Sequence, residues 1–444
     1  MTESSRSVVH TIRVPTPNTS PVSGVRHPHL TSAASMTRVD EKLGRALARR
    51  RDVGTLRALQ LPDASAADAV DFYSNDYLGF ARSQPLRQLV ETRQAELRSQ
   101  HEHMLGATGS RLISGNSRFF MEVESDLAAF YNSEAALLFN SGYAANMGVM
   151  SCVPQAEDVI LYDELVHNSC HEGIRLSRAK GRAVAFRHND LDDLERKVQQ
   201  YVAPSSEKDV CVYVVVESLY SMDGDFAPLE AMAALCERMG AFLIVDEAHS
   251  TGVYGPQGSG IVRELGLEVK YKNALACRVH TFGKAMGCHG AVVCGSQVLI
   301  DYLVNYARSF IYTTAFPFDQ LVSVACVHEF SASRAAEALR HHVIELVQYF
   351  KEKVSSNPSI PRDALLASDS PIQGVVFEGN HRVLMASQQM NAMGIRVIPI
   401  RSPTVPKGAE RFRIVIHADN SRREVDLLVN ALAAMFEARR DSKL

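Results

Sequence analysis

The sequence of 444 residues has no tryptophan, no CxxC pair of cysteines and no long apolar run. A membrane-spanning helix needs about 18 consecutive apolar residues, and no segment comes near that length. The 47 basic and 50 acidic residues balance to a net charge of −3, which gives no electrostatic case for nucleic acid or an anionic membrane as partner. These absences favour a small or zwitterionic substrate.

The eight cysteines lie mostly in apolar segments such as DVCVYVVVE. They are expected to be reduced, buried thiols rather than disulfides or zinc ligands, which is typical of an intracellular, soluble protein. Hydrophobic residues make up 46% of the chain and charged residues 22%, the usual balance of a globular protein. Because the length exceeds one typical domain, we expect a large domain and a smaller one.

The first 36 residues differ in composition from the rest. They are rich in serine, threonine and proline, and contain Arg6, Arg13 and Arg26 but only Glu3 as an acid. We predict a disordered extension. The composition also resembles an organellar transit peptide, although four prolines oppose the amphipathic helix that such peptides form.

From residue 37 onward, helix-like and strand-like segments alternate. VDEKLGRALARRRDVGTLRAL has helical spacing of charged and aliphatic residues, and predicts a charged N-terminal helix. The β-branched runs VCVYVVVE and AFLIVDEAH, with the helix-like LEAMAALCERMG between them, favour a parallel sheet covered by helices on both faces. Later strands (IQGVVFEG, GIRVIPI, RFRIVIH) predict a smaller α+β domain. The expected divisions are 1–36, the extension; 37–75, an N-terminal helix and connecting segment; 76–315, the large domain; and 316–444, the small domain.

In open parallel sheets, ligands bind at the carboxyl ends of the strands. The stretch HTFGKAMGCHGAVV places Lys284 among small and apolar residues at such an end. Gly283, Gly287 and Gly290 predict a backbone that bends or lets another group approach closely. A desolvated lysine with a lowered pKa is the form that makes a Schiff base. The alternative is a loop lysine that reaches solvent.

Asp246 directly follows the predicted strand AFLIV. Alone it would be interpreted as a helix cap. Together with a lysine at another strand end, it suits the pyridinium partner of pyridoxal 5'-phosphate, which lets that cofactor act as an electron sink. His249 would lie near the cofactor's phenolic oxygen or support Asp246, and otherwise is a hydrogen-bonded core histidine.

Other strand ends carry polar residues that fit the same cofactor. Gly142 and Tyr143 open a predicted helix, whose free amides can bind phosphate. His167 follows VILYD and can stack on a planar ring, and Ser221 can hydrogen-bond a cofactor oxygen. Thr281 precedes the lysine by three residues and can contact the phosphate. Each of these residues could also be an ordinary loop residue. Only their occurrence together indicates a cofactor site.

Two arginines fit substrate binding. Arg401 in IPIRSPTVPKG follows a predicted strand and can bind a carboxylate through two parallel hydrogen bonds. Arg57 belongs to a charged stretch in which most residues face water. For both, the alternative is a solvated surface arginine.

Taken in order, seven motifs resemble the α-oxoamine synthase family over residues 41–435: SNDYLGF, GATGSRLISGNS, FNSGYAANMGVM, ESLYSMDGD, DEAHSTGVYGPQGSG, HTFGKAMG and IPIRSPTVP. Members of this family use pyridoxal 5'-phosphate to join an amino acid to an acyl-CoA with loss of CO₂. The resemblance implies a fold-type I transferase, with a large domain built on a mostly parallel seven-stranded sheet and a smaller α+β domain. It also implies a homodimer. GATGSRLISGNS and SPTVP most resemble the members that condense L-alanine with pimeloyl-CoA in biotin biosynthesis.

The resemblance implies a role for each candidate residue. Lys284 is the Schiff-base lysine, Asp246 the partner of the pyridine nitrogen, and His167 the residue stacked on the ring. Further cofactor contacts are expected from Gly142, Tyr143, Ser221, His249 and Thr281, and substrate contacts from Arg57, Asn75, Arg401 and Thr404.

Two other functions stay open at this point. A different α-oxoamine synthase, using serine or glycine and another acyl-CoA, shares nearly every residue named above. A non-catalytic paralogue usually lacks the lysine, so the joint presence of Lys284, Asp246 and His167 argues against it.

The chain ends in Ser442, Lys443 and Leu444. A C-terminal Ser-Lys-Leu is recognised by the peroxisomal import receptor. We therefore expect a eukaryotic, peroxisomal protein, in a compartment where chain shortening generates acyl-CoAs.

Overall fold

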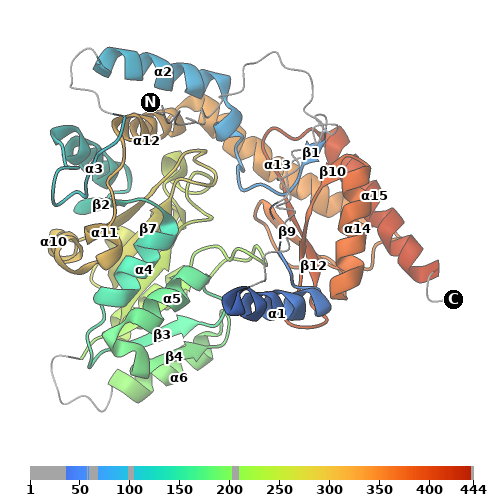
Figure 1. The fold of residues 1–444 in the computed structure, drawn as a ribbon, viewed down its shortest axis with the longest axis horizontal. Helices are drawn as coiled ribbons and strands as arrows, with labels where there is room; N and C mark the ends of the chain where they lie inside the picture. The colour runs from blue at the N-terminus through green and yellow to red at the C-terminus, as the bar shows by residue number, and fades with distance from the viewer. Residues whose placement is uncertain (1–36, 58, 60–68, 99–104, 203–209, 442–444) are drawn as a thin grey trace, which may run out of the picture. The chain divides into compact units, whose positions relative to one another are not determined.

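The computed structural model describes residues 37–57, 59, 69–98, 105–202 and 210–441 (Figure 1). The predicted extension over 1–36 and the terminal tripeptide lie outside the described residues. Contacts divide the chain into two compact units, Met1–Ala69 and Val70–Leu444. The domain boundaries expected after residues 75 and 315 stay predictions.

The first unit contains the predicted N-terminal helix, α1 (Arg38–Asp52). Thr37 caps it: its hydroxyl accepts from the Asp40 amide, while the Asp40 carboxylate accepts from the Thr37 amide. Arg57 lies beyond the helix and is exposed.

A seven-stranded sheet forms the centre of the second unit and confirms the predicted fold class. Its order is β2-β8-β7-β6-β5-β3-β4, and only β8 runs antiparallel to its neighbours. The strands are β2 (Ala135–Phe139), β3 (Val159–Asp163), β4 (Ala183–Phe186), β5 (Val212–Glu217), β6 (Phe242–Asp246), β7 (Leu275–Thr281) and β8 (Ala291–Gly295).

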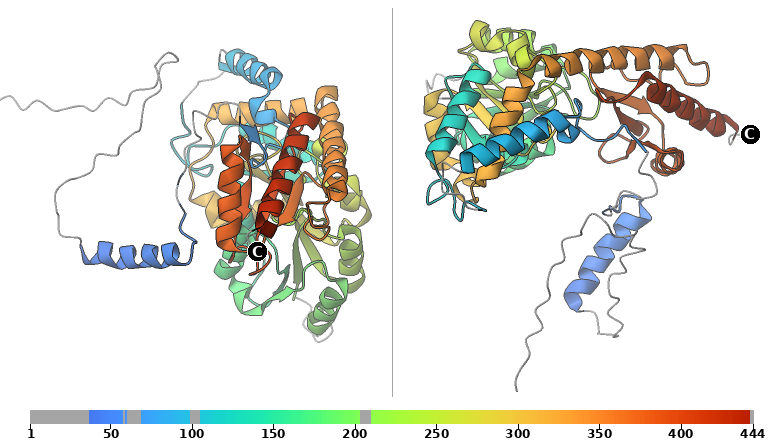
Figure 2. Two further views of the ribbon diagram at one scale, coloured as in Figure 1. Left: turned by 90° about the vertical axis from the view of Figure 1, so that its right-hand side faces the viewer. Right: turned by 90° about the horizontal axis from the view of Figure 1, so that it is seen from above.

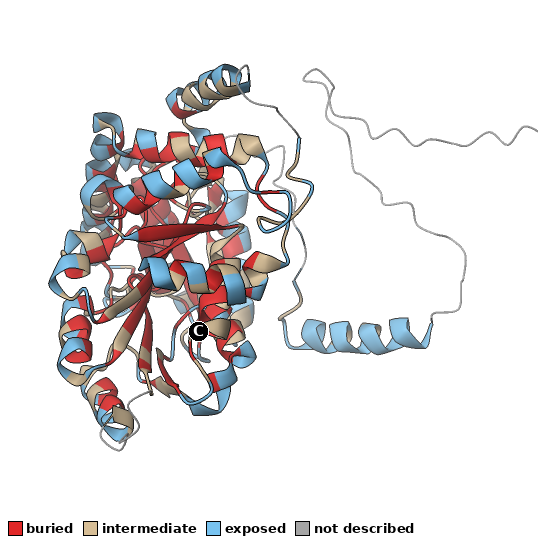
Figure 3. Ribbon diagram, turned by 90° about the vertical axis from the view of Figure 1, so that its left-hand side faces the viewer, coloured by how far each residue is buried: buried red, intermediate tan, exposed pale blue. Residues whose placement is uncertain are grey.

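Helices cover both faces of this sheet because its strands are apolar on both sides. In β5, Val214 and Val216 pack in one core cluster, and Val215 between them packs in another. Figure 3 shows the strands buried and the outer sides of the helices exposed. The cluster with Val214 includes α6 (Leu191–Val202), α7 (Leu229–Met239), α8 (Ile261–Glu264) and α9 (Leu267–Lys270); the cluster with Val215 includes α4 (Gly142–Cys152), α5 (Asn168–Leu176), α10 (Gln297–Tyr306) and α11 (Arg308–Ile311).

The C-terminal part contains an antiparallel sheet of order β11-β12-β9, which lies beside the long helix α13 (Figure 2). The predicted strand GIRVIPI divides into two short ones, since β10 pairs in parallel with β1 whereas β11 pairs with β12. The bounds are β1 (Val70–Asp71), α2 (Gln84–Arg98), α3 (Arg118–Phe130), α12 (Phe318–Ser331), α13 (Arg334–Ser356), β9 (Ile372–Val376), α14 (Asn380–Ala392), β10 (Ile395–Arg396), β11 (Ile398–Ile400), β12 (Arg411–Val415) and α15 (Arg422–Asp441).

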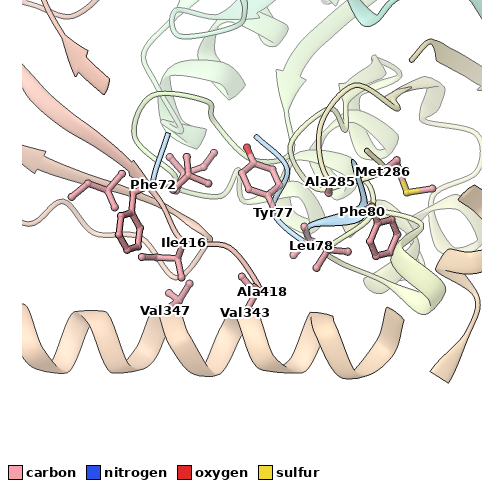
Figure 4. Close-up of a cluster of buried hydrophobic side chains, with 14 of the residues drawn as sticks. Phe72, Tyr77, Leu78, Phe80, Ala285, Met286, Val343, Val347, Ile416 and Ala418 are labelled. Atoms are coloured by element: carbon pink, nitrogen blue, oxygen red, sulfur yellow. The ribbon is translucent and has the colours of Figure 1, made fainter. Parts of the chain in front are cut away.

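The segment after β1 joins the two sheets through a shared apolar core. Figure 4 shows Tyr77 beside Ala285 and Phe80 beside Met286, the two residues that follow Lys284, and Phe72 beside Ile416, which follows β12. All are at most 2% exposed. The Tyr77 carbonyl also accepts from the Ala418 amide at 2.8 Å. Packing therefore fixes the segment that contains Tyr77 against the turn that contains Lys284.

All eight cysteines fall in the described part of the chain, and each is a free thiol. Five are buried as predicted, whereas Cys152, Cys211 and Cys288 are only partly buried. Among the described residues, no helix is long and apolar enough to cross a membrane.

The glycines around Lys284 serve the packing of the chain itself. Gly287 has φ +60°, and a Cβ there would lie 2.3 Å from the Ala81 amide nitrogen. Gly290 has φ +117°, and its Cβ would lie 2.6 Å from the Phe316 ring. Gly283 meets nothing closer than 3.8 Å. The sequence correctly predicted that other atoms come close to the backbone at Gly287 and Gly290. Those atoms belong to the protein itself, at Ala81 and Phe316.

Replacing Gly287→Ala is expected to lower the free energy of unfolding by at least about 2 kcal/mol, because both the positive φ and the overlap with the backbone at Ala81 must be relieved. Calorimetric melting of the purified protein measures the loss. Gly283→Ala, in the same turn, is the matched control and should change stability little. Equal losses in the two variants would contradict this account.

Candidate active site

The carboxyl ends of three neighbouring parallel strands place charged side chains at one edge of the large sheet. Glu217 ends β5, Asp246 ends β6, and Lys284 follows β7 by three residues. Glu217 and Asp246 are register partners, so their side chains belong to the same row. Both are at most 5% exposed. This edge of the sheet is the candidate active site.

Lys284 is hydrogen-bonded within this site. Its Nζ lies 2.8 Å from His249 Nε2, and His249 Nδ1 lies 2.6 Å from the Tyr77 hydroxyl. His249 and Tyr77 are buried. The sequence placed His249 near the cofactor or near Asp246; in the structure it bonds to the lysine.

The environment of Lys284 favours an unprotonated amine. Burial lowers the pKa of Lys284, Asp246 and Glu217 partly restore it, and Arg413 lowers it again, with a net value of about 8 against the ordinary 10.5. The lowered pKa expected from the sequence is confirmed. Burial, with the nearby Lys284, also lowers the pKa of His249 well below its usual value, so His249 is neutral at neutral pH.

Asp246 is held by two hydrogen bonds. Its Oδ2 accepts from Asn146 Nδ2 at 2.6 Å, and its Oδ1 accepts from the Ala248 amide at 2.9 Å. Asn146 Nδ2 also lies 3.0 Å from Ser169 Oγ, which is 2.7 Å from His167 Nδ1. A continuous chain of contacts therefore links Asp246 to His167.

His167 is exposed and begins α5 as its cap, accepting from the Ser169 amide. Although the residue is exposed, neighbouring protein atoms partly desolvate its ring and lower the pKa of His167, and the Asp246 carboxylate partly opposes that shift. Sequence reasoning missed Asn146 and Ser169, although an asparagine among the apolar residues of YAANMGVM was a visible signal.

The predicted phosphate contacts come together at the start of α4. A Cβ on Gly142 would lie 3.2 Å from Thr281 Oγ1, so the helix start and the end of β7 are in close contact. Tyr143 is the next residue of α4 and is exposed. The first amides of a helix have no partner within it and can bind an anion.

The arginine that reaches Asn75 is Arg413, in β12. Its Nη2 donates to Asn75 Oδ1 at 2.9 Å, and its Nε donates to the Ser221 carbonyl at 2.6 Å. Tyr77 also donates to Asn75 Oδ1, at 3.3 Å. Sequence reasoning missed Arg413, although the alternation in RFRIVIH places Arg411 and Arg413 on one face of the strand.

Arg401 and Thr404 follow β11, where the Thr404 amide donates to the Arg401 carbonyl at 2.9 Å. Thr404 is exposed and Arg401 is half-buried. Arg57 belongs to the first compact unit. The substrate contacts expected of these three residues stay predictions.

The residues present fit pyridoxal phosphate. Asp246 offers a carboxylate to a ring nitrogen, His167 a flat ring, the start of α4 a phosphate site, and Lys284 an amine for an aldehyde. Burial raises the pKa of Glu217 well above its usual range, and Asp246 adds to the shift. Asp246 and Glu217 thus both place carboxyl groups near the Lys284 amine.

Comparison with known proteins supports this chemistry. Residues 67–432 match the family model of class I and II aminotransferases. An 8-amino-7-oxononanoate synthase of Emericella nidulans is 39% identical over 409 residues, which cover 89% of this chain and 96% of that protein. An aminoacyl transferase sphA of Aspergillus fumigatus is 35% identical over 410 residues, 88% of this chain and 86% of that protein.

A solved structure of SPT with PLP as an internal aldimine shares the fold, with a TM-score of 0.77 and 24% identity. The match covers 90% of this chain and 98% of that chain. Both the family model and the relatives span most of the sequence. The chain therefore belongs to the aminotransferase class I and II family, and within it to the α-oxoamine synthases, which makes it a pyridoxal-phosphate-dependent acyltransferase.

Proposed function

We propose that this acyltransferase joins L-alanine to pimeloyl-CoA, releasing CoA and CO₂ and forming 8-amino-7-oxononanoate for biotin biosynthesis. The observation that carries the chemistry is the half-buried Lys284 amine, of pKa about 8, near the Asp246 carboxylate. The 39% identity to the synthase of Emericella nidulans supports this choice of substrates.

The cofactor is proposed to be held by the residues that the sequence predicted for it: Gly142, Tyr143, His167, Ser221, Asp246, His249, Thr281 and Lys284. Bound there, pyridoxal phosphate supplies an electron sink for the amino acid's Cα. Asn146 and the Ala248 amide keep the Asp246 carboxylate oriented, so that it can hold a proton on a ring nitrogen. These bonds fix the acceptor before any ligand arrives.

Lys284 is the proposed base that removes the proton from Cα of alanine. An amine with a pKa near 8 is a stronger proton acceptor at neutral pH than a solvated lysine, because a larger fraction of it is unprotonated. His249, which is neutral and hydrogen-bonded to Nζ, orients the amine. The same amine can return a proton after CO₂ is lost.

We propose that the substrate carboxylate is bound by Asn75, Arg401 and Thr404, together with Arg413. Arg413 is 3% exposed, and its two hydrogen bonds fix the plane of the guanidinium. Hydrogen bonds through Asn75, Tyr77 and His249 would then connect the arginine that holds the carboxylate to the Lys284 amine. Arg57 is proposed to contact the acyl-CoA.

A second candidate uses serine or glycine with another acyl-CoA. The specific observation in its favour is the 35% identity to aminoacyl transferase sphA over nearly the same length. The buried network described above contains nothing that selects an alanine methyl group. An assay with each amino acid therefore has to distinguish the two candidates.

The purified protein with pyridoxal phosphate and pimeloyl-CoA is expected to release CoA and form an amino-ketone with alanine, at least about tenfold faster than with glycine or serine. Mass spectrometry identifies the product. Lys284→Ala should abolish it, and Lys272→Ala, at an exposed lysine, should not. If product forms with serine or glycine but not with alanine, the second candidate function is the correct one.

The enzyme is also proposed to be a homodimer. Exposed large apolar side chains support a subunit interface: Leu112 and Ile113 are 52% and 85% exposed, and Tyr312 is 76% exposed. The segment with Tyr312 would contribute to the partner's phosphate site. Light scattering should give about twice the chain mass of 48.9 kDa; a monomer at micromolar concentration would refute the dimer.

We propose that the enzyme is imported into peroxisomes through its terminal residues Ser442, Lys443 and Leu444. There it would meet the acyl-CoA that chain shortening generates. A fluorescent protein fused to the N-terminus should mark peroxisomes, and deletion of Leu444 should disperse the signal. Leu427→Ala removes an exposed leucine outside the tripeptide and should leave the distribution unchanged. An unaltered pattern after loss of Leu444 would contradict the proposal.

A further inference from the structure

A cluster of charged residues lies beside the Lys284 network and takes no part in it. The His188 ring bridges two carboxylates: Nδ1 is 2.9 Å from Asp163 Oδ1, and Nε2 is 2.7 Å from Asp225 Oδ2. Asp163 ends β3, His188 follows β4, and Asp225 lies in the loop after β5. These strands are neighbours in the order β5-β3-β4, so the cluster spans three adjacent strand ends.

Asp163 shapes the turn that leads to His167. Its Oδ1 accepts from the Leu165 amide at 2.9 Å, and its carbonyl accepts from the Val166 amide at 3.1 Å. The Asp163 side chain is 0% exposed, so its carboxylate is fixed inside the protein. His167 is the next residue after this turn and begins α5.

Asp225 closes the loop that contains Ser221. Its carbonyl accepts from the Tyr220 amide at 3.0 Å, and the Tyr220 carbonyl accepts from the Gly224 amide at 2.9 Å. The Asp225 carboxylate also accepts from Asn189 Nδ2 at 2.7 Å, besides its bond to His188. His188 and Asn189 thus hold this loop from the side of the large sheet.

The C-terminal sheet holds the same loop from its other side. Arg411 makes an ion pair with Asp223, and Arg413 donates to the Ser221 carbonyl. Ser368 Oγ donates to the Gly224 carbonyl at 2.7 Å. The loop over residues 221–225 is therefore tied to both sheets. The His188 ring connects it to the turn before His167, and Asn189 adds a second link, because its backbone amide donates to Asp163 Oδ2 at 2.9 Å and its side chain to Asp225.

The charge on His188 suits this position. Burial lowers the pKa of His188, but its hydrogen bonds to Asp163 and Asp225 outweigh burial and raise that pKa to about 10. A cation between two carboxylates relieves their mutual repulsion. The Tyr220 ring meets the His188 ring edge-on, with centroids 4.4 Å apart, and restricts its rotation.

We propose that His188 is a positioning residue that fixes the His167 turn and the Ser221 loop relative to each other, through its two bonds to Asp163 and Asp225. The inference rests on the proposed contacts of His167 and Ser221 with the cofactor. His188 itself touches none of the reacting groups. Its effect is on how well the pocket is preformed for pyridoxal phosphate.

The test measures the dissociation constant of pyridoxal phosphate from the full-length protein, followed by the visible absorbance of the bound cofactor. His188→Gln keeps one hydrogen bond but loses the charge and the second bond, and should weaken binding about tenfold. Asp225→Asn leaves the bond to Asp163 intact and should weaken binding in the same direction. The double variant should lose less than the sum of the two, because both changes break one link.

His342→Gln, at an exposed histidine of α13, is the matched control and should bind the cofactor normally. His188→Lys, which restores a cation, should recover part of the affinity. A lower melting temperature with unchanged cofactor affinity in both His188→Gln and Asp225→Asn would overturn the proposal, since that is the result of a purely structural cluster. If His188→Gln fails to fold, the affinity of Asp225→Asn decides alone.

The cofactor measurement is independent of the substrates. Weakened binding in the variants, together with no amino-ketone from the unaltered protein, would refute the proposed condensation and leave the role of His188 standing. Normal condensation by the unaltered protein, together with unchanged cofactor affinity in the variants, would support the proposed condensation and refute the role of His188. Absence of cofactor binding in the unaltered protein would overturn both.

Discussion

The whole site depends on a lysine amine that is largely withdrawn from solvent where three strands end. A buried ammonium without compensation is costly, so its surroundings decide its charge. Asp246 and Glu217 favour the ammonium form, whereas burial and Arg413 oppose protonation. The result is an amine that is neither a permanent cation nor a fully neutral base near pH 8. Such an amine can both hold and release a proton under ordinary conditions.

This balance needs contributions from both sheets. Asp246 and Lys284 come from the large sheet, whereas Arg413 comes from β12 of the C-terminal sheet. The network from Lys284 through His249, Tyr77 and Asn75 to Arg413 crosses between the sheets, supported by the apolar core around Tyr77 (Figure 4). Binding an anion at Arg413 would neutralise the cation that lowers the lysine's pKa. Substrate binding and base strength would thereby be linked electrostatically.

Much of the site could be predicted from the sequence, for a physical reason. Parallel strands with continuous apolar runs must be buried, and the polar residues that follow them must meet at one edge. Asp246, His167 and Lys284 were found in this way. Asn146 and Arg413 were missed because they lie inside a helix and a strand, where only tertiary packing shows that a polar side chain points into the site. The division of GIRVIPI into β10 and β11 was missed because the choice between two partner strands leaves no local pattern.

The most direct test of the buried, balanced amine is the pH dependence of acylation at Lys284 in the cofactor-free, full-length protein, read by peptide mass mapping. The account predicts a midpoint near pH 8. Asp246→Asn removes a carboxylate that favours the ammonium and should shift the midpoint down, while Arg413→Met removes an opposing cation and should shift it up. A midpoint near 10.5, the ordinary value for lysine, or shifts in the same direction for both variants, would contradict the account.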